Sequence, residues 1–368
     1  MKAEKYLKNA YAVLLAAACI AGGAGALYLA AAGAEQSAVL LCVCGVLASV
    51  FFAPFLHEAG HIVFAKANGF TVLYVKIFIF RMDNTGEKKR FSLCSPFASE
   101  QTQAAPAYAE KRPGDMKKRA ALYTSGGLAF GGVFLCIAAV FAAAFAGRGG
   151  AAGGVSYFCL GVLPYAAYLF FLNVAPFTYG GGKTDMRVLI DILKQTPFGV
   201  RFLAALNAQG QIAEGKAYSE IDAAYLKNLP AIAEDEPLFI MNLFYLYYAA
   251  AEKGETESAA GYINRIAALA PYLTPQEEKS ALCELLYMNA VSGDEEQAQK
   301  CFSALCAYGE TATAAENRAA AAYYVMRGDT ARADEYISRA VAAARKEKFS
   351  GAWKSEELLL RQTTGERR

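Results

Sequence analysis

Both histidines of the 368-residue chain lie four residues apart, in the stretch FLHEAGHIVFAKANG at residues 55–69. His57 and His61 enclose Glu58 in the pattern His-Glu-x-x-His. On a helix this spacing places the two imidazoles on one face, where they can share a Zn²⁺ ion. Glu58 then lies beside the metal and can accept a proton from a water molecule that attacks a carbonyl group. The pattern predicts that His57 and His61 bind Zn²⁺ and that Glu58 is the general base.

Two ordinary helix histidines are the alternative interpretation. The motif, however, directly follows the almost uncharged run AVLLCVCGVLASVFFAP. Two imidazoles and a carboxylate are costly at the end of such a segment unless they bind something, which favours the metal site.

A zinc site of this kind needs a third protein ligand, and the chain contains no further histidine. The nine cysteines show no metal-binding or disulfide spacing, so we expect a carboxylate. Asp185 follows the stretch NVAPFTYGGGKT, which contains a flexible loop that can return it to the histidines. Asp185 can also serve only to stabilise the N-terminus of the helix that it begins. Asp191, two turns into that helix, is the alternative ligand.

Four apolar runs are long enough to cross a bilayer, at residues 10–32, 38–67, 120–146 and 155–174. Lysine and arginine are concentrated before the first run and between the second and third, and are almost absent from the other two loops. This distribution predicts a multi-pass protein of the cell membrane with both termini in the cytoplasm. It also places the end of the second run, and therefore the histidines, at the cytoplasmic face.

The loop between the second and third runs begins with FTVLYVKIFIFRM at residues 70–82, which is rich in β-branched and aromatic residues. Together with KKRFSLCSPF at residues 88–97, it predicts a short β hairpin beside the membrane rather than a fifth span. We expect the remainder of this loop to be mobile, with its basic residues contacting anionic lipid of the bilayer.

The second half of the chain is alanine-rich and contains a repeat. Gly254, Gly293 and Gly328 each precede an alanine by five residues, and successive glycines are roughly 35–40 residues apart. This period predicts paired antiparallel helices of a solenoid, and it resembles tetratricopeptide repeats. The formal net charge of only +2 gives no indication of a nucleic-acid partner.

Residues 38–195 resemble the site-2 protease family of intramembrane zinc metalloproteases. Members of that family pair a His-Glu-x-x-His helix with a later transmembrane helix that carries an N-x-x-P…D-G motif. The most specific part of the resemblance is FLHEAGH at residues 55–61, followed by Asn173-Val174-Ala175-Pro176 and Asp185. Met186 stands where the family usually has glycine, and Asp185 lies farther from Asn173 than is usual.

The resemblance implies a role for each matching residue. His57, His61 and Asp185 would bind zinc, and Glu58 would be the general base. Asn173 would position the peptide or polarise its carbonyl group.

We therefore predict a mainly α polytopic membrane protein with about four transmembrane helices and a short β hairpin, followed by a soluble helical-hairpin domain. The expected parts are an N-terminal transmembrane helix at 1–37, a site-2 protease-like core at 38–195, a linker with connecting helices at 196–229, and cytoplasmic tetratricopeptide-like repeats at 230–368.

The predicted function is that of a zinc metalloendopeptidase that hydrolyses peptide bonds of transmembrane or membrane-associated substrates near the cytoplasmic face. The repeats would dock a substrate or a protein partner, and an edge strand near residues 70–82 would hold the peptide extended. The alternative is a catalytically silent zinc-binding membrane scaffold that recruits partners through its repeats. A zinc transporter is disfavoured, because the other apolar runs carry no series of acidic or histidine residues.

Overall fold

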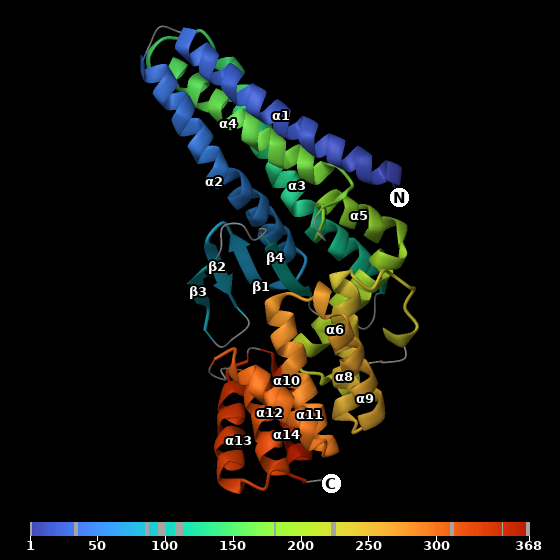
Figure 1. Cartoon of the computed structure of the whole chain (residues 1–368). Coiled ribbons are helices and arrows are strands. Elements are labelled where there is room, and N and C mark those ends of the chain that lie inside the picture. The colour runs from blue at the N-terminus through green and yellow to red at the C-terminus, as the bar shows by residue number, and fades with distance from the viewer. Residues whose placement is uncertain are drawn as a thin grey trace. The chain divides into compact units, whose positions relative to one another are not determined.

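The computed structural model describes residues 2–32, 36–84, 88–94, 101–106, 113–179, 182–221, 226–309, 313–347 and 349–365. This described chain is mainly helical and divides into two compact units (Figure 1). The first unit comprises Met1–Asp83, Phe91–Ala104 and Pro113–Lys194. The second comprises Asn84–Arg90, Ala105–Arg112 and Gln195–Arg368.

In the described part of the first unit, four helices are long and apolar enough to cross a membrane, which confirms the four predicted runs. They are α1 (Lys2–Ala32), α2 (Gln36–Ala67), α3 (Pro113–Ala144) and α4 (Gly150–Val174), shown in blue to green in Figure 1. Helices are suited to a lipid bilayer because each forms its own backbone hydrogen bonds, which lipid cannot supply.

Glycines let α2 lie backbone to backbone against two neighbouring helices. A Cβ atom on Gly161 of α4 would lie 2.1 Å from the carbonyl oxygen of Cys42 in α2. On the α3 side, a Cβ atom on Gly60 would lie 2.2 Å from the carbonyl oxygen of Gly126. Membrane helices associate through such close contacts, because lipid removes the hydrophobic drive that packs soluble helices.

The loop after α2 forms a four-stranded sheet in the order β3-β2-β1-β4. Its strands are β1 (Phe70–Ile77), β2 (Phe80–Asp83), β3 (Arg90–Leu93) and β4 (Gln101–Pro106). The first two strands form an antiparallel hairpin with Ile77 opposite Phe80, so the predicted hairpin is present.

The sheet differs from the prediction in two respects. Residues 101–106, expected to be mobile, form β4 beside β1, where Ala104 and Ala105 are buried. Strand β1 is therefore paired on both sides, and the prediction that residues 70–82 supply an edge strand is wrong. The terminal strands of the described sheet are β3 and β4.

Among the residues described for Gln195–Arg368, the second unit consists of helices joined by turns and loops. The helices are α6 (Pro197–Ala213), α8 (Pro237–Glu252), α9 (Thr256–Ala268), α10 (Pro275–Ser292), α11 (Glu295–Cys306), α12 (Ala314–Met326), α13 (Thr330–Ala344) and α14 (Ser350–Thr363).

The predicted helical hairpins are confirmed at α8–α9, α10–α11 and α12–α13. The turns of these hairpins contain Gly254, Gly293 and Gly328, with φ of 71°, 75° and 74°. These left-handed values favour glycine, because a Cβ atom would be strained there. The alanines five residues later (Ala259, Ala298 and Ala333) are all buried.

A buried ionic cluster joins α10, α12 and α14 of the second unit. The Arg318 guanidinium is fully buried, and its Nη2 lies 2.7 Å and 2.9 Å from the two carboxylate oxygens of Glu284. Its Nε donates to Glu356 at 2.8 Å. Such a pair persists in the interior only when its geometry and hydrogen bonding compensate for lost solvation.

Candidate metal centre

The C-terminal part of α2 carries the three residues of the motif. His57, Glu58 and His61 are all buried, and one ligand atom from each lies within 4.8 Å of the others. The two imidazole centroids are 5.0 Å apart, with their planes at 83°. The i, i+4 spacing therefore places both rings on one face of the helix, as predicted.

Helix α3 passes directly over these rings because it presents a glycine to them. A Cβ atom on Gly127 would lie 2.5 Å from Nε2 of His61 and 2.7 Å from Nε2 of His57. Any side chain at this position would displace the imidazoles. The sequence alone did not predict this contact of Gly127 with the histidines.

Asp185 reaches the histidines through a hairpin that was expected to be a flexible loop. Strands β5 (Thr178–Tyr179) and β6 (Gly182–Lys183) are antiparallel, while residues 180 and 181 lie outside the described chain. The Thr184 hydroxyl donates to the carbonyl oxygen of Ala175 at 2.6 Å, tying the end of the hairpin to the end of α4.

Helix α5 (Asp185–Lys194) begins directly after this anchor. The backbone N–H of Arg187 donates to the Thr184 hydroxyl at 3.4 Å, so Thr184 caps the helix. The cap and the hairpin together fix Asp185 at the first helical position.

One oxygen of Asp185 contacts both imidazoles, although His61 and Asp185 are 124 residues apart in the chain. Its Oδ2 lies 3.0 Å from Nε2 of His57 and 3.2 Å from Nε2 of His61. Donor atoms at neighbouring corners of a tetrahedral zinc site are about 3.3 Å apart when each bond is near 2.0–2.1 Å. The nitrogen and oxygen atoms therefore have spacings close to those of a zinc site.

Hydrogen bonding around His61 supports a positive charge at this point. Its Nδ1 lies 3.1 Å from the backbone carbonyl oxygen of Tyr123, which can only accept, so Nδ1 carries a proton. In the neutral imidazole, Nε2 then presents a lone pair to the Asp185 carboxylate. That arrangement is favourable only if a proton or a metal ion lies between them, and the same tautomer is the one that binds metal through Nε2.

The two imidazoles favour the charged form of the Asp185 carboxylate. Burial raises its pKa, but the contacts with His57 and His61 outweigh that effect and hold the pKa below its ordinary value. Asp185 therefore offers the site an anionic oxygen, as a zinc ligand must.

Asp191, the alternative ligand, has different partners from those of Asp185. Asp191 is buried on the same helix, where its Oδ2 lies 3.2 Å from Nε of Arg187. Asn173, near the end of α4, donates its side-chain N–H to the carbonyl oxygen of Leu169 at 3.1 Å. The geometry thus favours Asp185 over Asp191 as the third ligand, and the role of Asn173 in substrate positioning stays a prediction.

Two residues that sequence reasoning missed hold Glu58. The Thr102 hydroxyl in β4 donates to Oε2 of Glu58 at 2.5 Å. The Tyr123 hydroxyl in α3 donates to the backbone carbonyl oxygen of Thr102, also at 2.5 Å. Tyr123 precedes Gly127 by one helical turn, so the two lie on one face of α3. No local pattern marks Thr102.

Replacing Asp185 with alanine should remove the metal. Full-length protein with intact ligands should carry about one zinc per chain, since the three ligands form one site. We expect Asp185→Ala and His57→Ala to lose it, measured by elemental analysis of purified protein. Asp191→Asn, which alters a carboxylate on the same helix, should keep it. Zinc lost from Asp191→Asn and kept by Asp185→Ala would contradict the geometry.

Adding a single methyl group at Gly127 should also cause loss of zinc, although all three proposed ligands stay in the chain. We expect Gly127→Ala to lose most of its zinc, because the new Cβ atom overlaps both Nε2 positions. Gly25→Ala is the matched control, since a Cβ atom there would meet nothing within 4 Å. Equal zinc content in the two variants, measured in the same way, would show that α3 does not confine the imidazoles.

No protein-family model, no curated protein and no solved structure matches this chain. What the site does is therefore inferred from its own geometry.

Proposed function

We propose that the protein is a membrane-embedded zinc metalloendopeptidase of the site-2 protease type. It would hydrolyse peptide bonds of transmembrane or membrane-associated substrates near the cytoplasmic face of the cell membrane. The observation that best supports this proposal is the contact of Asp185 with both His57 and His61, with Glu58 alongside. Two imidazoles, one carboxylate ligand and a further carboxylate beside them are a set that can support metal-assisted peptide hydrolysis.

His57, His61 and Asp185 would hold the zinc ion, which when bound polarises a carbonyl group and makes a water molecule more acidic. Glu58 would accept a proton from the attacking water and return it to the leaving amine. Thr102 keeps one oxygen of Glu58 in place, and the carbonyl of Tyr123 keeps His61 in its binding tautomer. These supports preorganise the site, so that less reorganisation is needed during reaction.

Strand β4 offers a route for the substrate. A transmembrane helix hides its carbonyl groups in internal hydrogen bonds, so the peptide must be extended before it is cut. Strand β4 is a terminal strand of the described sheet, and its Thr102 contacts the proposed base. A peptide that added to this edge as a further strand would therefore pass Glu58.

The helical hairpins of the second unit would dock a substrate or a partner protein, because stacked hairpins present extended surfaces. The same hairpins also suit a catalytically silent scaffold that binds zinc and recruits partners. The two functions differ in whether Glu58 is needed.

Replacing Glu58 with glutamine separates the protease from the scaffold. Glutamine has nearly the same shape but cannot accept the proton, so cleavage should fall by at least about a hundredfold while zinc is kept. Membrane fractions from cells that produce wild type or Glu58→Gln would be compared by mass spectrometry of new peptide termini. Fragments seen with wild type and with Gly25→Ala, but absent with Glu58→Gln, are expected. Identical fragments from all three would rule out the protease.

Thr102 should act on the rate through Glu58. On a substrate found by that comparison, Thr102→Val should lower kcat about tenfold, as losses of supporting hydrogen bonds around metal sites do. KM and zinc content should change little, because Thr102 contacts none of the three ligands proposed for zinc. Thr102→Ser restores the hydroxyl and should recover most of the rate. If the serine variant were as slow as the valine variant, the hydrogen bond would not be the cause.

A further inference from the structure

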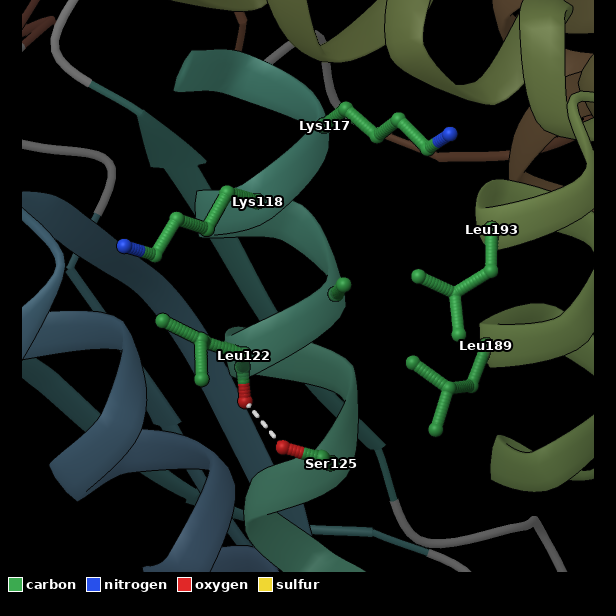
Figure 2. Close-up of a pocket in the computed structure, with 7 residues that line it drawn as sticks. Lys117, Lys118, Leu122, Ser125, Leu189 and Leu193 are labelled. Carbon is green, nitrogen blue, oxygen red and sulfur yellow. Dashed lines mark hydrogen bonds between the residues drawn. The ribbon is translucent and has the colours of Figure 1, made fainter. Parts of the chain in front are cut away.

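A groove of about 370 Å³ lies between the first turns of α3 and the helix α5 that carries Asp185 (Figure 2). Leu189 and Leu193 point from α5 towards α3, and Lys117 extends from α3 above them in the view of Figure 2. The remaining lining residues are Lys118, Ala121, Leu122 and Ser125. The groove is thus apolar along its length and cationic at one end.

None of the described residues that line this groove is acidic. Lys117 is half-buried and Lys118 is exposed. The Ser125 hydroxyl is used within α3, where it donates to the carbonyl oxygen of Leu122 at 2.8 Å. The ligand that matches these residues has an anionic head and an apolar chain.

Most of the α3 residues that line the groove lie on the side of that helix away from the metal centre. Gly127 marks the face of α3 that meets the imidazoles. At 100° per residue, Lys118, Leu122 and Ser125 lie about 140–180° around the helix from Gly127. This geometry disfavours a substrate peptide on its way to Glu58.

The groove lies instead at one end of a candidate membrane span. The span in α3 begins at Asp115, so Lys117 and Lys118 are in its first turn, where headgroups meet the hydrocarbon. Leu122 is 37% exposed and Leu193 52% exposed, which leaves apolar surface uncovered by protein.

We propose that this groove binds one anionic phospholipid. The phosphate would lie at Lys117, whose side chain extends over the two leucines of α5, and an acyl chain would run along Leu189 and Leu193 (Figure 2). Leu189 and Leu193 follow Asp185 by about one and two turns on α5, so the lipid would also hold that helix against α3. The proposal concerns lipid binding alone and does not depend on catalysis.

Lipid retention by the full-length protein tests this proposal. The protein would be placed in nanodiscs of phosphatidylcholine with or without phosphatidylglycerol, then released into a zwitterionic detergent for native mass spectrometry. We expect wild type to retain about one phosphatidylglycerol per chain, because each chain offers one such groove. The double variant Lys117→Gln/Lys118→Gln should retain it about tenfold less, since each lysine near a headgroup contributes to anionic-lipid affinity.

Two further variants separate the groove from general surface charge. Lys88→Gln/Lys89→Gln removes the same charge from two exposed lysines outside the groove and should retain the lipid as wild type does. Ala121→Phe fills the groove without changing charge and should lose the lipid. Equal losses from both lysine pairs, or full retention by Ala121→Phe, would overturn the proposal.

Hydrogen exchange in the same nanodiscs gives a second measurement. The backbone amides of α5 should exchange about tenfold more slowly with phosphatidylglycerol than without it, and this protection should vanish in Lys117→Gln/Lys118→Gln. A soluble acidic peptide should not produce the protection. If the peptide protected α5 and the lipid did not, the groove would be a protein-binding surface and the lipid assignment would be wrong.

Discussion

The contact of a single Asp185 oxygen with Nε2 of both His57 and His61 is the constraint on which the first unit depends. Because Nδ1 of His61 already donates to the carbonyl of Tyr123, the space between the carboxylate and the ring calls for a positive charge. Three segments must converge to build this point: the end of α2, the start of α5, and α3 with a glycine between them. One additional methyl group at Gly127 of α3 would push the donor atoms apart.

The helices around the site also approach one another through glycines rather than through large side chains. Gly45 faces the carbonyl oxygen of Phe158, and Gly60 faces that of Gly126, so α2 touches both α3 and α4 through backbone atoms. Contacts of this kind replace, in lipid, the burial of large apolar residues that holds a soluble core together. The polar cluster is then supported by the hydrogen bond that Thr102 donates to Glu58 and by the one that the Tyr123 carbonyl oxygen accepts from His61, since a buried carboxylate and imidazole require partners.

Local patterns were sufficient for part of this architecture. The spacing of His57 and His61 is set by one helix, and Gly254 marks a turn between adjacent helices, so both could be read from short stretches. Asp185 was predicted as the third ligand because the chain has no third histidine, which left a carboxylate as the expected donor. Strand β4 was missed because QTQAAP has little β propensity and is held by pairing with β1. Thr102 was missed for the same reason, since its role exists only once β4 is in place.

The close packing of α2 has a consequence for motion. A helix joined backbone to backbone on two sides cannot slide or turn without breaking both seams, so it acts as a fixed frame for His57 and His61. Asp185, by contrast, follows directly on Thr184, whose hydroxyl ties this part of the chain to the end of α4. Any opening of the centre would therefore move Asp185 rather than α2.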